Sequence, residues 1–274
     1  MTTEDHRGTR VNVQLLGCIE LRTAGGDRIP ASPAVGLLLA ALAWSPNAFV
    51  SDDELVDRLW EDGSPAHPRN ALYTLATRLR KALNPVGTGG AACAVVRRRG
   101  GYLLSIDEEA VDVRRFRTRV RKARDAACRG TDEEALRLYE GALAQWRGDP
   151  LSGLRTVWAD AVRVALRHEW RSALLNGVEV ALRLNRHDDY LPQLHRLSVL
   201  HPLDERVSGL LMLALHRSGR QNEALQCFHR LRFELVRGLG DEPGPELRAL
   251  HERILRRDER LLTGPPLLDA LAWS

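Results

Sequence analysis

The sequence predicts a mainly α-helical protein in two parts, the first with small antiparallel sheets among its helices and the second all-α. Alternating apolar and polar residues, typical of short strands, occur only within about the first hundred residues. From Val111 to about Leu262 the apolar residues instead recur at three- and four-residue spacing. We therefore expect one domain at residues 1–107 and a second at 108–262, followed by a tail at 263–274.

The composition is that of a globular protein. Its 274 residues are 44% apolar, which is enough for a core, and the formal net charge is +4. The N-terminus is polar and no run approaches the roughly 18 apolar residues of a membrane span, so we expect a cytoplasmic, nucleoid-associated protein without a membrane partner. No two cysteines have C-x-x-C spacing, which favours reduced thiols over a zinc site or a disulfide framework.

The first part begins with strands and an apolar helix. Val11, Val13 and Leu15 alternate with polar residues, and a turn at residues 23–27 reverses the chain, which predicts a small antiparallel sheet. The apolar run from Val35 to Trp44 predicts a helix.

The next helix has a distinct N-terminal signal. Ser51 and Glu54 form a capping box, and Asp52, Asp53 and Glu54 fall in the first turn, where the helix dipole favours negative charge. We therefore interpret this acidic cluster as a helix start rather than a metal site.

A third helix and a hairpin complete the first part. The loop from Glu61 to Pro68 leads into a helix from about Arg69 to Leu83, and residues 95–97 and 102–104 predict strands on either side of Gly100-Gly101. A sheet, three helices and a terminal hairpin are the element order of a winged helix-turn-helix.

The third helix is amphipathic. Leu72, Ala76, Leu79 and Leu83 form a narrow apolar stripe, while the opposite face carries hydrogen-bonding and cationic side chains, as a helix in a major groove requires. An ordinary solvated surface helix is the alternative. The DNA-contacting residues predicted on this helix are Asn70, Thr74, Thr77, Arg78, Arg80 and Lys81.

The local charge favours nucleic acid. Between Arg69 and Arg99 the chain has seven basic residues and no acidic one. At the hairpin, Arg97, Arg98 and Arg99 would repel one another unless an anion lay beside them, and a phosphate backbone or minor groove supplies that anion. A second arginine-rich segment, residues 114–124, fits a solvated helix face or additional phosphate contacts.

The second part contains an internal repeat. Asn185-Arg186 and Gly219-Arg220 are 34 residues apart, and the apolar positions that follow them keep the same offset. This is the tetratricopeptide period, in which stacked helical hairpins present a concave surface to another macromolecule. We therefore expect an all-α, tetratricopeptide-like domain.

Several segments carry a family resemblance over about residues 11–262. Residues 70–72, 78–83 and 101–104 resemble an OmpR-type output domain. Residues 130–148, 201–203, 219–225, 239–247 and 250–251 resemble the bacterial transcriptional activator domain. In this order the two modules resemble the Streptomyces antibiotic regulatory protein family.

The resemblance implies a pathway-specific transcriptional activator of antibiotic biosynthesis. Such a protein binds direct repeats in double-stranded DNA near promoters, self-associates there and recruits RNA polymerase holoenzyme, without a cofactor. The first helix departs from the family at residues 33–36, which removes an expected phosphate contact, and the basic hairpin is hypothesised to compensate. Candidate polymerase contacts in the loop are Glu61, Asp62, Ser64 and His67.

Two other function classes are less well supported. A protein-interaction adaptor with a repurposed winged helix is the alternative reading of the helical repeats. An enzyme is not expected, because the chain has no Gly-rich phosphate loop and no G-x-S-x-G, and its histidines lack metal-ligand spacing. No catalytic or metal-ligating residue is therefore predicted.

Overall fold

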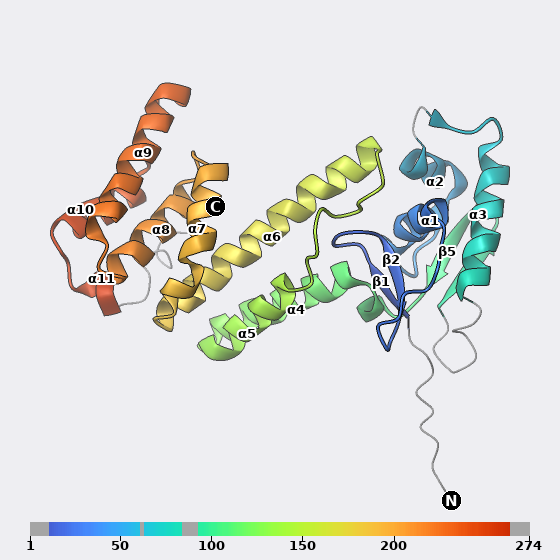
Figure 1. Ribbon diagram of the computed structural model, residues 1–274, viewed down its shortest axis with the longest axis horizontal. Helices are drawn as coiled ribbons and strands as arrows, with labels where there is room; N and C mark the ends of the chain where they lie inside the picture. The colour runs from blue at the N-terminus through green and yellow to red at the C-terminus, as the bar shows by residue number, and fades with distance from the viewer. Residues whose placement is uncertain (1–10, 61–62, 84–92, 264–274) are drawn as a thin grey trace, which may run out of the picture. The chain divides into compact units, whose positions relative to one another are not determined.

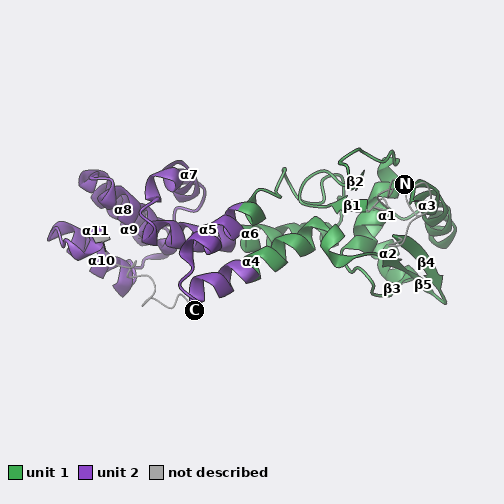
Figure 2. Cartoon of the chain, turned by 90° about the horizontal axis from the view of Figure 1, so that it is seen from below, with its two compact units in different colours: residues 1–121, 141–170 green, residues 122–140, 171–274 purple. Residues whose placement is uncertain are grey.

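The computed structural model describes residues 11–60, 63–83 and 93–263, and helices dominate it (Figure 1). The chain forms two compact units (Figure 2). Unit 1 comprises residues 1–121 and 141–170, and unit 2 comprises residues 122–140 and 171–274. Glu61, Asp62 and the predicted tail beyond Thr263 lie outside the described residues.

Unit 1 contains the predicted winged helix. Strands β1 (Val11–Gln14) and β2 (Glu20–Thr23) form an antiparallel pair with Val11 opposite Thr23. A second antiparallel sheet has the order β3-β5-β4, built from Val50–Ser51, Gly101–Ser105 and Ala94–Arg98. Its helices are α1 (Pro33–Ala43), α2 (Asp52–Leu59) and α3 (Pro68–Leu83).

The predicted Ser51 cap is confirmed at the start of α2, whereas the Glu54 carboxylate accepts from the Arg58 guanidinium instead of closing the capping box. The Ser51 hydroxyl accepts a hydrogen bond of 3.1 Å from the Glu54 backbone N–H. This bond satisfies one of the helix's free N-terminal donors, and the acidic first turn is stabilised by the helix dipole.

The apolar stripe predicted on α3 is also confirmed. Its buried side chains face α1 and α2, and full burial of each leucine contributes about 1.5–3 kcal/mol. This packing fixes which face of α3 remains exposed. The buried residues are Leu72, Leu75, Ala76, Leu79 and Leu83.

Beyond β5 the regular structure of the described chain is helical, apart from isolated bridges. One-turn 3-10 helices lie at Glu108–Ala110 and His187–Tyr190. The α-helices are α4 (Asp112–Cys128), α5 (Asp132–Leu143), α6 (Val157–Arg183), α7 (Leu191–Leu200), α8 (Glu205–Arg217), α9 (Gln221–Leu239), α10 (Pro245–Leu255) and α11 (Arg260–Thr263). Within the described part of the chain, none of these helices combines the length and apolarity needed to cross a membrane.

The 34-residue period recurs in the backbone of unit 2. Asn185 and Gly219 both end helices in the left-handed region, with φ of 57° and 74°. After each of them the next N–H bonds to a carbonyl five residues earlier, Arg186 to Ala181 and Arg220 to Leu215, both at 2.8 Å. The repeated residues thus serve as equivalent helix C-caps.

A buried carboxylate connects the segment after residue 107 to the N-terminal part of unit 1. Asp112, at the start of α4, is fully buried and accepts hydrogen bonds from the backbone N–H groups of Leu15 and Leu16. Arg147 donates to the same carboxylate at 2.7 Å. Burial raises the pKa of Asp112, while these hydrogen bonds oppose that shift.

A second connection within unit 1 involves α2 and the start of α6. The buried Thr156 hydroxyl donates to the Arg58 carbonyl at 3.1 Å, and the Arg58 guanidinium lies 5.0 Å from the Trp158 ring centre. Trp158 in turn meets Trp44 edge to face, with ring centres 6.2 Å apart. The compact unit therefore includes the winged helix together with segments from both sides of the expected boundary at 107/108.

Candidate nucleic-acid interface

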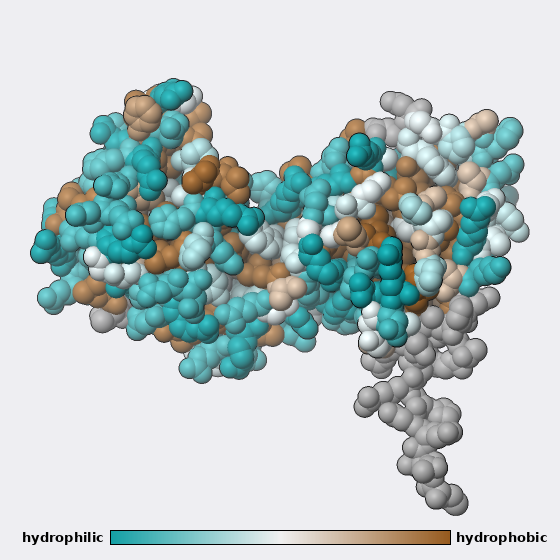
Figure 3. Space-filling model, viewed as in Figure 1, coloured by the Kyte–Doolittle hydropathy of each residue, from teal (hydrophilic) through white to brown (hydrophobic). Residues whose placement is uncertain are grey.

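One continuous face of α3 is exposed. Because α3 packs through its leucine stripe, the residues on the opposite side are not covered by any described part of the chain. Hydrophilic and intermediate side chains gather over this helix (Figure 3). The exposed set includes five of the six predicted helix residues together with Arg69 and Tyr73: Arg69, Asn70, Tyr73, Thr74, Thr77, Arg78 and Lys81.

Two cations on this face have no internal partner. Arg78 and Lys81 are exposed, and within the described residues they form no ion pair or side-chain hydrogen bond. Arg69 pairs with Asp53 at 3.3 Å, but both side chains are about three-quarters or more exposed, so the pair adds little stability. Arg78 and Lys81 are therefore free to meet an anion.

The threonines use their hydroxyl protons within the helix. Thr74 donates to the Asn70 carbonyl at 3.0 Å, and Thr77 donates to the Tyr73 carbonyl at 2.9 Å. Each hydroxyl can still accept a hydrogen bond, but its donor is already satisfied. Toward DNA, both threonines are therefore hydrogen-bond acceptors rather than donors.

Arg80 differs from its neighbours because it packs inward. Its Nε donates to the Val95 carbonyl of β4 at 2.8 Å, and its guanidinium lies 6.0 Å from the Tyr102 ring centre. Arg80 thus holds α3 against the hairpin. The geometry supports this connecting role more directly than the predicted DNA contact.

Arg97 also has an internal partner. Its guanidinium forms two hydrogen bonds to the carboxylate of Asp52, at 2.5 and 2.9 Å, and lies 4.4 Å from the Tyr102 ring centre. The hydrogen bonding to Asp52 raises the pKa of Arg97. The expectation that all three hairpin arginines require an external anion is therefore wrong for Arg97.

The tip of the hairpin presents the other two arginines. Arg98 and Arg99 are exposed, and no ion pair or hydrogen bond to either side chain exists among the described residues. Gly100 closes the turn with φ of +80°, and its carbonyl accepts from the Asp52 N–H at 2.8 Å. Asp52 therefore fixes the hairpin through both its side chain and its backbone.

The strand after the turn needs a glycine. A Cβ on Gly101 would lie 2.2 Å from the Val50 carbonyl oxygen and 2.6 Å from the Phe49 ring. Only a residue without a side chain allows β3 and β5 to pair this closely.

Two of the four predicted polymerase contacts, both in the loop before α3, lie among the described residues. Ser64 and His67 are both exposed. His67 lines a hollow of about 430 Å³ together with Asp53 and Asp57 of α2 and Arg69 and Asn70 of α3. Asp53 pairs with Arg69 inside this hollow, and Asp57 is left without an ion-pair partner among the described residues.

Three residues of the second arginine-rich segment are tied to their own unit, whereas Arg121 and Lys122 are exposed. Arg115 donates to the Asn12 side chain at 2.9 Å, Arg117 forms a bidentate pair with Glu169, and Arg119 donates to the Gly141 carbonyl. These contacts favour a structural role for the three arginines over additional phosphate contacts.

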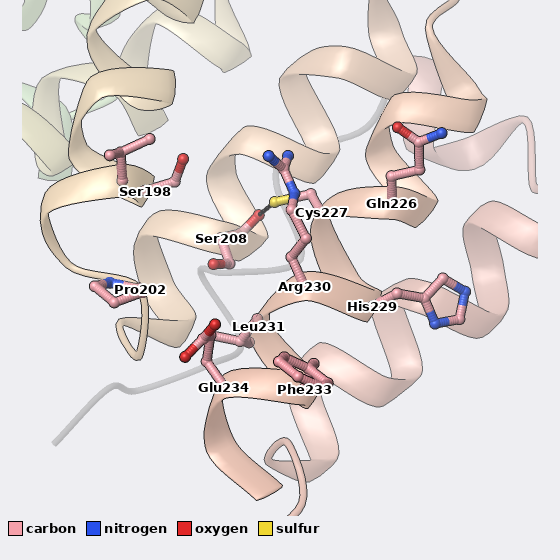
Figure 4. Close-up of a pocket in the computed structure, with 11 residues that line it drawn as sticks. Ser198, Pro202, Ser208, Gln226, Cys227, His229, Arg230, Leu231, Phe233 and Glu234 are labelled. Carbon is pink, nitrogen blue, oxygen red and sulfur yellow. Dashed lines mark hydrogen bonds between the residues drawn. The ribbon is translucent and has the colours of Figure 1, made fainter. Parts of the chain in front are cut away.

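Unit 2 has a groove between α7, α8 and α9 (Figure 4). It encloses about 560 Å³, and its lining includes Val199, Cys227, Arg230 and Phe233. Burial raises the pKa of the Cys227 thiol, whose sulfur lies 4.0 Å from the Ser208 carbonyl oxygen. A thiol held protonated is a poor nucleophile, so the groove contains no activated cysteine.

In the described ranges, no group of three or more His, Cys, Asp or Glu side chains is placed to hold a metal ion.

Comparisons with known proteins agree with this architecture. The family model described as "Transcriptional regulatory protein, C terminal" matches residues 26–104, and the "Bacterial transcriptional activator domain" model matches residues 111–255. The chain belongs to the Streptomyces antibiotic regulatory protein family. The relatives of this chain are named as regulatory or transcriptional regulatory proteins.

Individual relatives support the assignment. Regulatory protein DnrI of Streptomyces peucetius is 32% identical over 267 residues, covering 96% of this chain and 98% of that protein. Transcriptional regulatory protein MoaR1 of Mycobacterium tuberculosis is 31% identical, covering 92% and 84%. The solved structure of Mycobacterium tuberculosis EmbR in complex with a low-affinity phosphopeptide is 30% identical, with a TM-score of 0.82 over 96% of this chain and 71% of EmbR.

Two contributors to the site are absent from the predicted contacts. Tyr73 flanks the polar face on the helical wheel and is 64% exposed, one turn before Thr77. The sequence explains Asp52 only as part of a helix N-terminus. Its link to Arg97 spans 45 residues and has no local sequence signal.

Proposed function

We propose that this protein is a sequence-specific DNA-binding transcriptional activator whose α3 helix enters the major groove. The observation that carries the proposal is the exposed face of α3, where Arg78 and Lys81 are unpaired among described residues beside Asn70. Arginine reads guanine and asparagine reads adenine through paired hydrogen bonds at the groove edge. The relatives' names as regulatory proteins support the same function.

The hairpin supplies a second, non-specific contact in this proposal. Arg98 and Arg99 meet phosphates or the minor groove, while Arg97 and Arg80 position the hairpin and α3 rather than touching DNA. Phosphate contacts add affinity for any sequence and fix the orientation of the reading helix.

The proposal extends to recruitment of RNA polymerase. A basic segment of the holoenzyme fits the hollow beside His67, because the Asp57 carboxylate there has no ion-pair partner among the described residues. Asp57→Asn would then reduce transcription from a bound promoter while leaving DNA affinity unchanged. A matched loss of DNA affinity would instead place Asp57 in DNA binding or folding.

The family also indicates which kind of genes the protein regulates. Because the chain belongs to the Streptomyces antibiotic regulatory protein family and is nearly coextensive with DnrI, we infer a pathway-specific activator of antibiotic biosynthesis that binds direct repeats and self-associates on them. Selection of bound fragments from genomic DNA, followed by footprinting, would reveal the operator. Protection of two repeats about one helical turn apart fits side-by-side protomers.

Salt dependence tests DNA binding itself. If several arginines neutralise phosphates, affinity falls steeply between low and physiological salt. Affinity that barely changes with salt would contradict the proposal and favour the alternative, a protein-interaction adaptor with a repurposed winged helix.

A further inference from the structure

The exposed face of α3 is less polar at its centre than a set of hydrogen-bonding residues would suggest. Tyr73, Thr74 and Thr77 are adjacent on the helix surface, because Thr77 follows the other two by four and three residues. Tyr73 exposes 64% of its surface, although a large aromatic side chain gains by being covered.

The two threonines extend this apolar area. Their hydroxyl protons are bonded to carbonyls one turn earlier in α3, at 3.0 and 2.9 Å. What each exposed side chain offers to a partner is therefore a methyl group and an acceptor oxygen. The patch made by Tyr73, Thr74 and Thr77 is flanked by Asn70 and Arg78, which retain free donors.

Only one base carries an apolar group on its major-groove edge. Thymine has a 5-methyl group there, and threonine methyls and aromatic side chains are suited to contact it. We propose that the patch of Tyr73, Thr74 and Thr77 recognises thymine 5-methyl groups, adjacent to the base read by Arg78. This inference rests on the proposed function and specifies what its reading helix selects.

Deoxyuridine provides the direct test, because it differs from thymidine only in lacking this methyl group. A duplex selected by the full-length chain from a random library is resynthesised with each thymidine replaced in turn by deoxyuridine, and the dissociation constants are measured. Loss of one buried methyl weakens binding about fourfold. At least one replacement should have this effect, with little change at thymidines outside the footprint.

Matched variants assign the effect to the helix. Thr77→Ser and Thr74→Ser keep the hydroxyl and remove the methyl, so one of them should bind thymidine and deoxyuridine duplexes equally. Thr77→Val keeps a methyl group and should retain the discrimination. Tyr73→Phe keeps the ring, whereas Tyr73→Ser removes it, so only the serine variant should lose a methyl contact.

The outcomes separate this inference from the proposed function. Specific, salt-dependent binding that is insensitive to every deoxyuridine replacement overturns methyl recognition and leaves DNA binding intact. If Thr77→Ser and Thr74→Ser keep the discrimination while Thr77→Val loses it, the hydroxyl rather than the methyl group is read and the inference is wrong. Absence of any sequence preference would contradict the inference and the proposed function together. Circular dichroism of each variant verifies that α3 and the remaining fold are intact.

Discussion

Arg97 and Asp52 join the hairpin to the start of α2 through two hydrogen bonds of 2.5 and 2.9 Å. The Asp52 side chain is only 8% exposed, whereas Arg97 is 44% exposed. Asp52 also donates its backbone N–H to the Gly100 carbonyl at the hairpin turn. Asp52 therefore holds the hairpin in place within the chain itself, independently of any contact that Arg98 and Arg99 make with DNA.

This pair predicts different salt responses for neighbouring arginines. Arg97→Gln should lower DNA affinity by disturbing the hairpin, but leave the slope of log affinity against log salt unchanged. Arg98→Gln should reduce the magnitude of that slope by about one, since a phosphate contact is lost. Titrations at several salt concentrations measure both slopes.

Asp52→Asn is the companion variant for Arg97. It should reproduce the affinity loss of Arg97→Gln, and the double variant should lose little more, because both changes break one interaction. A slope reduced as much by Arg97→Gln as by Arg98→Gln would show that Arg97 contacts phosphate after all.

Asp112→Ala should destabilise the chain by about 2–4 kcal/mol, because it leaves the N–H groups of Leu15 and Leu16 buried without an acceptor. Urea unfolding followed by tryptophan fluorescence measures this loss. Asp112→Asn retains one acceptor oxygen and should cost less. If the wild type, Asp112→Ala and Asp112→Asn were equally stable, Asp112 would not stabilise unit 1.

Gly101→Ala should destabilise the hairpin by about 3 kcal/mol, since the added methyl meets the Val50 carbonyl at 2.2 Å. Gly63→Ala is a suitable control, because a Cβ there has no neighbour within 4 Å among the described atoms. Thermal unfolding of the two variants compares them. A Gly101→Ala protein as stable as the control would contradict the close pairing of β3 with β5.

His216 predicts a pH dependence for unit 2. Burial, and secondarily the charge of Arg217, lowers its pKa below the ordinary 6.5. Because the folded pKa is the lower one, its stabilising contribution is present above pH 6.5 and is lost as the pH falls through the folded value.

The urea midpoint should accordingly fall between pH 7.5 and 5.5, and His216→Leu should reduce that fall. His187 has the same direction of shift from burial, so some dependence should persist in the variant. An unchanged pH profile in His216→Leu would mean that this histidine is not protonated on unfolding in this range.

Local patterns were sufficient to predict the amphipathic α3, the Ser51 cap and the basic hairpin, because helical period and turn residues report on neighbouring positions. Asp112 and Asp52 could not be assigned in this way. Their partners Leu15 and Arg97 lie 97 and 45 residues away, and a carboxylate at a helix start has an adequate local explanation. The inward bond of Arg80 to Val95 is hidden for the same reason.

The central claim is that α3 reads bases while the hairpin holds the backbone. Binding of Arg78→Ala and of the double variant Arg98→Ala/Arg99→Ala to a selected duplex and to random DNA tests this division most directly. Arg78→Ala should lose about 1–3 kcal/mol on the selected duplex and little on random DNA, whereas the hairpin variant should weaken both alike. Equal losses on both duplexes for Arg78→Ala would contradict α3 as the reading helix.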